Sequence, residues 1–200
     1  VVEGVSAVFK AAERVEITLS FFEATWALAA WFFRSQGVEW VIWEVGLGGR
    51  LDATNICEPS VSAICSLSLD HTHVLGDSLA EIAWEKSHIY REHGVALTGC
   101  EGETLKVLRE VSVVQPRVID QEREAVEALY LQRSREDEDS LSSAMISTAH
   151  GRSNMALALA IARAAQWITP TLNILDLQGW RDLKWPGRLE RLEGVWLDCA

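Results

Sequence analysis

Two short apolar runs on either side of a helical segment constrain the fold of this chain more than any other feature. Residues 61–69, bounded by Pro59 and Asp70, and residues 95–99 have the composition of strands. Residues 78–92 between them have helical apolar spacing, and Ser78 with Glu81 matches a helix capping box. Strand, helix and strand in this order predict a right-handed βαβ unit. We therefore expect an α/β fold, a mostly parallel sheet flanked by helices.

The other elements are predicted from the same periodicities. Residues 20–36 have helical spacing that ends at Gly37, and residues 40–43 are apolar on both faces, as in a buried parallel strand. We also expect strands at 111–114, 117–119 and 192–197, helices at 121–131, 153–167 and 172–182, a solvated loop at 134–140, and a turn or linker at Pro186-Gly187.

Composition limits the kind of partner. The chain has 18 basic and 29 acidic residues, a formal net charge of −11, which argues against nucleic acid or an anionic membrane as a partner. The longest apolar runs, 26–33 and 155–162, are far too short to cross a bilayer, and no secretory signal opens the chain. The four cysteines form no C-x-x-C pair, so we expect reduced thiols and a cytoplasmic protein.

Polar side chains follow two of the predicted strands. Glu44 precedes a glycine-rich stretch that ends in Arg50, and His71 lies in the sequence Asp-His-Thr-His at 70–73. Because ligands of open α/β sheets bind beyond the carboxyl ends of the strands, Glu44 and His71 could share a hard divalent cation such as Mg²⁺. A turn carboxylate beside a satisfied histidine is the simpler interpretation of the same spacing.

Lys86 lies on the apolar stripe of the helix predicted at 78–92. Its ammonium could snorkel to the edge of the sheet, which the residues alone favour. Alternatively, desolvation could expose a neutral amine that adds carbon dioxide and becomes an anionic carbamate. A zinc site at His71 and His73 lacks a third ligand at typical spacing, and Cys65 in mid-strand has the position of an inert structural thiol.

Five segments together resemble one known family. They read EVGLGGRLDATN at 44–55, LDHT at 69–72, IAWEKSHI at 82–89, PGRLE at 186–190 and WLDCA at 196–200. In this order they are similar to folylpolyglutamate synthase/dihydrofolate synthase of the Mur ligase superfamily, over nearly the whole chain and most weakly over 101–149. The resemblance implies that residues 1–184 are an incomplete ATP-binding central domain. Residues 185–200 would then be a linker and the first strand of a second α/β domain.

The resemblance also implies an activity. Members of this family are ATP-dependent ligases of folate biosynthesis and one-carbon metabolism, which join L-glutamate to dihydropteroate or a folate through an acyl phosphate. The chain opens at Val1, carries no G-x-x-x-x-G-K-[ST] phosphate loop and stops at Ala200, so we interpret it as an inactive fragment of a monomeric enzyme. Two alternatives remain: another Mur-type amino-acid ligase, or a non-catalytic remnant that binds a nucleotide or metal.

Site residues carried over from the family fall into three groups. Glu44, His71 and Lys86 would be catalytic and hold two Mg²⁺ ions, with Lys86 as a carbamate, which overturns the preference for snorkelling. The residues implied for ATP are Asn154, Arg188 and Asp198, and those implied for the pterin or folate are Ser20, Phe21, Phe22 and Arg50. Core packing is an alternative role for the two phenylalanines. The family motif EKAGI reads EKSHI at 85–89 here, which could crowd the metal or supply a ligand.

Overall fold

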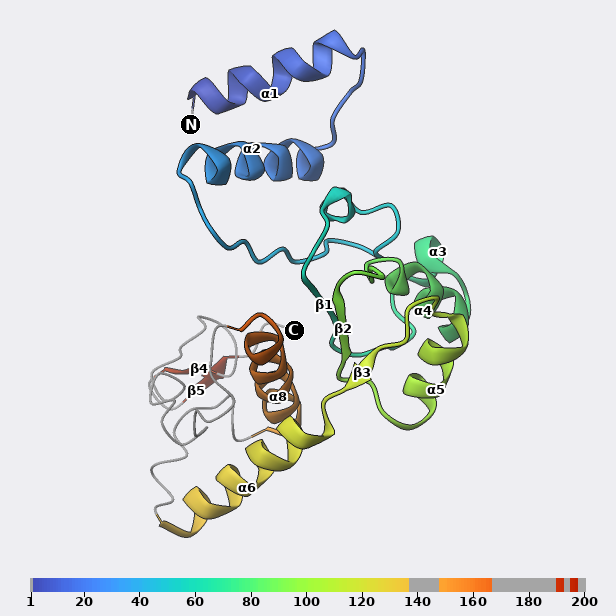
Figure 1. Ribbon diagram of the computed structural model, residues 1–200, viewed down its shortest axis with the longest axis vertical. Helices are drawn as coiled ribbons and strands as arrows, with labels where there is room; N and C mark the ends of the chain where they lie inside the picture. The colour runs from blue at the N-terminus through green and yellow to red at the C-terminus, as the bar shows by residue number, and fades with distance from the viewer. Residues whose placement is uncertain (1, 137–147, 167–189, 193–194, 198–200) are drawn as a thin grey trace.

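The computed structural model describes residues 2–136, 148–166, 190–192 and 195–197, with side chains in 2–131 and 148–166. The described residues form a three-stranded parallel sheet in the order β1 (Val61–Ile64), β2 (Val95–Thr98) and β3 (Arg117–Val118). Helices α4 (Leu79–Ser87), α5 (Gly102–Val111), α6 (Asp120–Glu136) and α8 (Ala149–Ala164) surround it, and α1 (Val2–Arg14) and α2 (Phe21–Ser35) lie side by side at one end (Figure 1). The predicted α/β class is confirmed.

The predicted βαβ unit is present, with shorter elements than the sequence suggested. The short helix α3 (Thr72–Leu75) and α4 lie between β1 and β2, which pair in parallel with Val61 opposite Val95. Ser78 and Glu81 form the expected capping box at the start of α4. The first strand ends at Ile64 rather than at 69, and the helix ends at Ser87 rather than at 92.

Two apolar clusters cover the two faces of the sheet. Adjacent residues of a strand point to opposite faces, and in β2 Ala96 belongs to one cluster while Leu97 belongs to the other. The first cluster joins the sheet to α4 and α5 and includes Ile64, Leu75, Ile82, Ala83 and Leu108. The second joins it to α6 and α8 and includes Ile119, Val126, Leu129, Met155, Leu157 and Ala160. The sheet is therefore the middle layer of three.

The helix predicted at 20–36 is confirmed as α2. Ser20 caps it in a second capping box, in which its hydroxyl accepts from the Glu23 amide and the Glu23 carboxylate accepts from the Ser20 amide. Gly37 follows the helix with φ +64°, a conformation that favours glycine. Residues 2–14, for which no element was predicted, form α1 and pack against α2.

The strand predicted at 40–43 is wrong. These residues have no assigned secondary structure and pair with no strand in the described part of the chain, and Ile42 is 80% exposed. Apolar side chains on both faces suggested a buried strand, but Trp43 instead packs its ring against Trp26 and Phe33 of α2, at 5.5 and 5.7 Å between centroids. The tertiary contact of one tryptophan thus overrides the local pattern.

Three other predictions need correction and two are untested. Residues 111–114 are not a strand, because Val111 ends helix α5 and residues 112–114 follow it without regular structure. The loop at 134–140 begins too early, since α6 continues to Glu136. The strand at 192–197 is a hairpin of β4 (Glu190–Leu192) and antiparallel β5 (Val195–Leu197). The helix at 172–182 and the turn at Pro186-Gly187 lie outside the described residues. The strand at 117–119 and the helices at 121–131 and 153–167 correspond to β3, α6 and α8.

We predict that Leu97→Ala destabilises the chain by about 2–5 kcal/mol, because Leu97 is fully buried between the sheet and α8 and its truncation leaves a cavity. Leu51→Ala is the matched control. Leu51 is 79% exposed, so the same truncation there should change the free energy of unfolding by less than about 0.5 kcal/mol. Urea unfolding followed by circular dichroism measures both, and equal losses would contradict the assigned core.

Candidate functional site

Asp52 organises the glycine-rich loop at residues 44–52. Its Oδ2 accepts hydrogen bonds from the amides of Gly46 and Leu47, both at 3.0 Å. Its Oδ1 accepts from the amide and the hydroxyl of Thr54 at 2.9 and 2.6 Å, which caps the 3₁₀ helix η1 (Ala53–Ile56). One carboxylate therefore holds both the start of the loop and the turn that follows it.

The glycines of this loop allow it to lie directly against its neighbours. A Cβ on Gly49 would lie 2.7 Å from the carbonyl oxygen of Glu85 and 3.0 Å from that of Lys86. A Cβ on Gly46 would lie 2.8 Å from the ring of Phe22. The loop thus contacts the last turn of α4 on one side and the first turn of α2 on the other.

Arg50 is bound to α4 at three points. Its amide donates to the carbonyl oxygen of Glu85 at 3.0 Å, and its Nε and Nη2 donate to Glu85 Oε1 at 3.1 and 3.0 Å. Its guanidinium lies over the ring of Trp84, 5.0 Å from the centroid. The described contacts of this predicted folate-binding side chain are therefore with α4, and its role toward a folate stays a prediction.

The charges of Glu44 and Lys86 both affect the pKa of the thiol of Cys65, which directly follows β1. Partial burial raises the pKa of the Cys65 thiol, the Cys100 thiol and the Glu44 carboxylate raise it further, and the Lys86 ammonium lowers it. Both charges therefore act on the same thiol. The joint placement of Glu44 and Lys86 in a metal site stays a prediction.

His71 begins α3 in a left-handed conformation, with φ 50°. Its amide donates to Asp70 Oδ1 at 2.7 Å, its Nε2 lies 3.7 Å from Asp70 Oδ2, and its exposed ring meets the edge of the His73 ring. In the described part of the chain, no three His, Cys, Asp or Glu side chains are grouped closely enough to hold a metal ion. The joint centre of Glu44, His71 and Lys86 stays a prediction.

The remaining predicted residues are placed as follows. Ser20 caps α2, Phe21 is 86% exposed, and Phe22 touches the loop at Gly46, so neither phenylalanine is a buried core residue. Asn154 is exposed on α8, with Nδ2 3.2 Å from His150 Nε2. Arg188 and Asp198 lie outside the described residues.

Asp52 and Glu85 are contributors to this geometry that the sequence analysis did not single out. Asp52 stands two residues before Thr54, the spacing of an Asx turn, which is a signal that could have identified it. Glu85 carries no such local signal, since its partner Arg50 is 35 residues away in the sequence.

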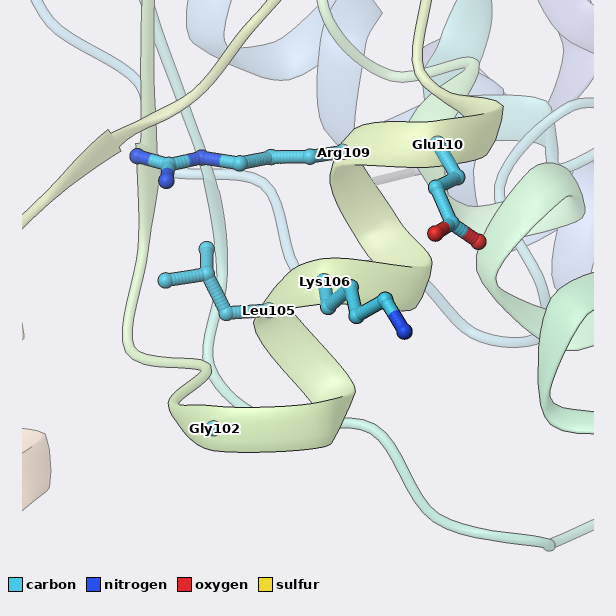
Figure 2. A pocket seen from close by; sticks show the side chains of 5 residues that line it. All are labelled: Gly102, Leu105, Lys106, Arg109 and Glu110. Atoms are coloured by element: carbon cyan, nitrogen blue, oxygen red, sulfur yellow. The ribbon is translucent and has the colours of Figure 1, made fainter.

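Two surface depressions lie away from these residues. One, of about 370 Å³, is on α5, where Leu105 and Arg109 project from one side of the helix and Lys106 from the other (Figure 2). The other, of about 480 Å³, lies beside the buried Glu122, which accepts from Arg117 and Arg163. Neither depression includes a predicted site residue. Within the described segments no helix is long and apolar enough to span a membrane.

Known proteins match the chain over most of its length. A dihydrofolate synthase/folylpolyglutamate synthase of Bacillus subtilis is 33% identical over 201 aligned residues, which cover 90% of this chain and 46% of the relative. A probable bifunctional folylpolyglutamate synthase/dihydropteroate synthase of Halobacterium salinarum is 32% identical over 182 residues, or 86% of this chain and 22% of the relative. No family model matches.

Solved structures agree with these matches. The apo form of L. casei FPGS superposes with a TM-score of 0.72 at 24% identity, over 98% of this chain and 53% of that one, which shows the same fold. E. coli FolC in complex with DHPP and ADP gives a TM-score of 0.51 at 37% identity, over 57% of this chain and 29% of that one.

The parallel sheet between helix layers is an α/β fold that the chain shares with the solved FPGS structure. Within that class, the chain belongs to the folylpolyglutamate synthase/dihydrofolate synthase family, as its motifs indicated. It spans just under half of the length of the Bacillus relative and less than a quarter of the Halobacterium one.

We predict that Cys65 reports on both neighbouring charges. Removing the cation with Lys86→Met raises the pKa of the thiol and slows its alkylation by iodoacetamide at pH 8. Removing the carboxylate with Glu44→Gln lowers the pKa and speeds the reaction. Each change should be about threefold, the size expected when one screened surface charge is lost.

Site-resolved mass spectrometry separates the Cys65 peptide from those of the other cysteines. Lys106→Met, on helix α5, is the control and leaves the rate unchanged, because Lys106 is not among the charges that act on Cys65. If Lys86→Met or Glu44→Gln behaved like this control, the two groups would not share the end of β1.

We predict that Gly49→Ala loosens the loop, because the added Cβ would press on the carbonyl oxygens of Glu85 and Lys86. The hydrogen bond from the Arg50 amide to Glu85 should open more often, so hydrogen exchange at that amide accelerates. Gly102→Ala strains a positive φ in open space and should leave the Arg50 amide protected. Unchanged exchange in Gly49→Ala would contradict the close approach.

Proposed function

We propose that this chain is the central part of an ATP-dependent ligase that adds L-glutamate to dihydropteroate or a folate through an acyl phosphate. The observation that carries the proposal is the loop at 44–52, whose family motif contacts Phe22 on one side and the Lys86 turn of α4 on the other. Identity above 30% with dihydrofolate and folylpolyglutamate synthases over most of the chain supports it.

The proposed reaction needs a triphosphate and a carboxylate held close together, with their negative charge neutralised. Lys86 and Glu44, whose charges both act on the Cys65 thiol after β1, would bring a cation and a metal-binding oxygen to this end of the strand. This is the edge of a parallel sheet at which open α/β folds bind ligands. The chain as a whole is strongly acidic, so local groups rather than the net charge must attract an anionic substrate.

Two Mg²⁺ ions would be held by Glu44, His71 and a carbamylated Lys86. The exposed Glu44 carboxylate and the exposed His71 imidazole are suitable donors, and the half-buried Lys86 acts on the same Cys65 thiol as Glu44 does. As an ammonium, Lys86 would repel a cation, whereas as a carbamate it would offer an anionic oxygen. Bound Mg²⁺ would supply charge neutralisation for the phosphates.

The substrates would approach from two sides. Ser20, Phe21, Phe22 and Arg50 would line the pterin or folate side, where aromatic faces suit a flat heterocycle. Phe21 and Phe22 are available for this, because both rings are at least partly exposed. E. coli FolC, at 37% identity, was solved with DHPP and ADP. Asn154, Arg188 and Asp198 would contact ATP.

The proposal extends to the organisation of the protein. Residues 1–184 would belong to the ATP-binding domain, and 185–200 would link it to a second domain that begins with the hairpin of β4 and β5. The working enzyme would be a cytoplasmic monomer, and these 200 residues alone would be inactive. Glutamate-dependent ADP release by the isolated chain would refute the last point.

The deciding experiment uses the full-length protein. With dihydropteroate or a folate, ATP, Mg²⁺ and L-glutamate, we expect ADP release that requires the pteroate and the amino acid together. Product formation followed by mass spectrometry gives the amide. Turnover of a peptidoglycan precursor instead would favour another Mur-type ligase, and no turnover with any substrate would favour a non-catalytic remnant.

We predict that Lys86→Ala lowers kcat/KM of that full-length enzyme about 10²- to 10³-fold, the range for loss of one group that stabilises transition-state charge. Lys106→Ala, on α5 beside the remote depression, should leave the rate unchanged. Steady-state kinetics with varied ATP measure both. Equal rates for Lys86→Ala and the unmodified enzyme would remove Lys86 from the catalytic site.

A further inference from the structure

In the last turn of α4 the Glu85 carbonyl is capped by a distant loop, whereas the carbonyls of Lys86 and Ser87 accept from the nearby Ile89 and Tyr90 amides. The last carbonyl groups of a helix lack partners within it, and a following glycine often supplies them. Here the residue after α4 is His88 in a right-handed conformation, and the carbonyl of Glu85 accepts from the Arg50 amide at 3.0 Å. The Arg50 guanidinium also lies near the helix C-terminus, where the helix dipole favours a positive charge.

We propose that Arg50 and Glu85 are a positioning pair that seats the loop on α4 and thereby fixes the direction in which Lys86 presents its amine. The catalytic meaning of this pair rests on the proposed function. The family motifs alone do not predict that Arg50 and Glu85 pair, because in the sequence both side chains could equally face solvent or substrate.

The contacts of the pair explain why it controls Lys86. Glu85 directly precedes Lys86 on the helix, so holding the Glu85 side chain and carbonyl fixes the rotation of the turn that carries both. Gly49 lies against the carbonyl oxygens of Glu85 and Lys86, so the loop cannot shift without moving that turn. Trp84 covers the guanidinium from the side.

Burial makes this ion pair stronger than an ordinary surface one. The side chain of Glu85 is 18% exposed and that of Arg50 is 36% exposed, and two guanidinium nitrogens share one carboxylate oxygen. Exposed ion pairs contribute little to stability because solvent screens the attraction between the charges. A partly buried pair covered by an aromatic ring loses less of that attraction.

The chain contains a matched control pair. Arg152 of α8 donates to Glu127 of α6 at 2.6 Å, and its guanidinium lies 4.3 Å from the centroid of the Tyr130 ring. The chemistry is the same as that of Arg50, Glu85 and Trp84, but the pair joins α6 to α8 rather than the loop to α4. A purely structural ion pair is therefore available for comparison in the same molecule.

The test measures the reactivity of the Lys86 amine toward a limiting amount of acetic anhydride. Mass spectrometry of the peptides compares its acetylation with that of Lys106, and the measurement needs neither ATP nor metal. We expect Glu85→Gln to change the relative labelling of Lys86 by about threefold, the factor that corresponds to loss of a part-exposed ion pair. Glu127→Gln should leave that ratio unchanged while lowering Tm to a similar extent.

Rescue distinguishes positioning from simple loss of stability. The double variant Arg50→Glu with Glu85→Arg restores the ion pair with reversed charges and should return the labelling of Lys86 toward its original value. In the full-length enzyme Glu85→Gln, which leaves the proposed folate-binding Arg50 in place, should lower kcat. Arg50→Lys keeps the charge but loses the two-nitrogen contact, so it should fall between the two.

Unchanged labelling in Glu85→Gln, or an equal change in Glu127→Gln, would overturn the positioning role. Failure of the proposed function has a different signature. The full-length protein would then lack ligase activity with every substrate, while the labelling of Lys86 would still respond to Glu85→Gln and to the reversed pair.

Discussion

The close approach of Gly49 to the end of α4 is the contact on which the rest of the site depends. It requires a residue without a Cβ, since any other would place an atom 2.7 Å from the Glu85 carbonyl oxygen. It brings Arg50 within reach of Glu85 and keeps the loop beside the turn of Lys86. Asp52 supplies the other half of the constraint by holding the Gly46 and Leu47 amides. The glycine motif is thus a packing requirement as well as a source of backbone freedom.

The parallel sheet sets where this assembly can form. Ala96 and Leu97 point from β2 into opposite layers, so helices must cover both faces. The crossover through α3 and α4 returns the chain to the start of β2, with Ser62 of β1 donating to the carbonyl of Ile89 just beyond α4. That bond holds the end of α4 against the sheet. Lys86 can therefore influence a thiol at the end of β1 although 21 positions separate the two residues.

Local signals predicted the parts of this fold that depend on local physics. The capping box at Ser78 and the βαβ order were readable because each involves neighbours in sequence. The strand expected at 40–43 is absent, and Trp43 there packs against two aromatic side chains of α2, a contact between residues distant in sequence that a local pattern cannot show. The partner of Arg50 could not be predicted either, because the sequence does not indicate which distant carboxylate an arginine contacts. The unusual position of Lys86 on an apolar helix face is visible in the sequence, whereas the influence that it shares with Glu44 on the Cys65 thiol is a property of the folded chain.

The departure from the family motif at 87–88 follows from the same packing. Serine and histidine stand where the family has alanine and glycine, and the added bulk could have crowded Lys86. Ser87 is buried, and its hydroxyl donates to the carbonyl of Trp84 at 2.9 Å. The His88 Nδ1 donates to that same carbonyl at 2.7 Å, and its ring packs edge-on against Trp84 at 4.4 Å between centroids. Both side chains thus contact Trp84. The Arg50 guanidinium also lies over the Trp84 ring. The His88 ring therefore adds to the aromatic packing around Trp84, the ring over which the Arg50 guanidinium lies.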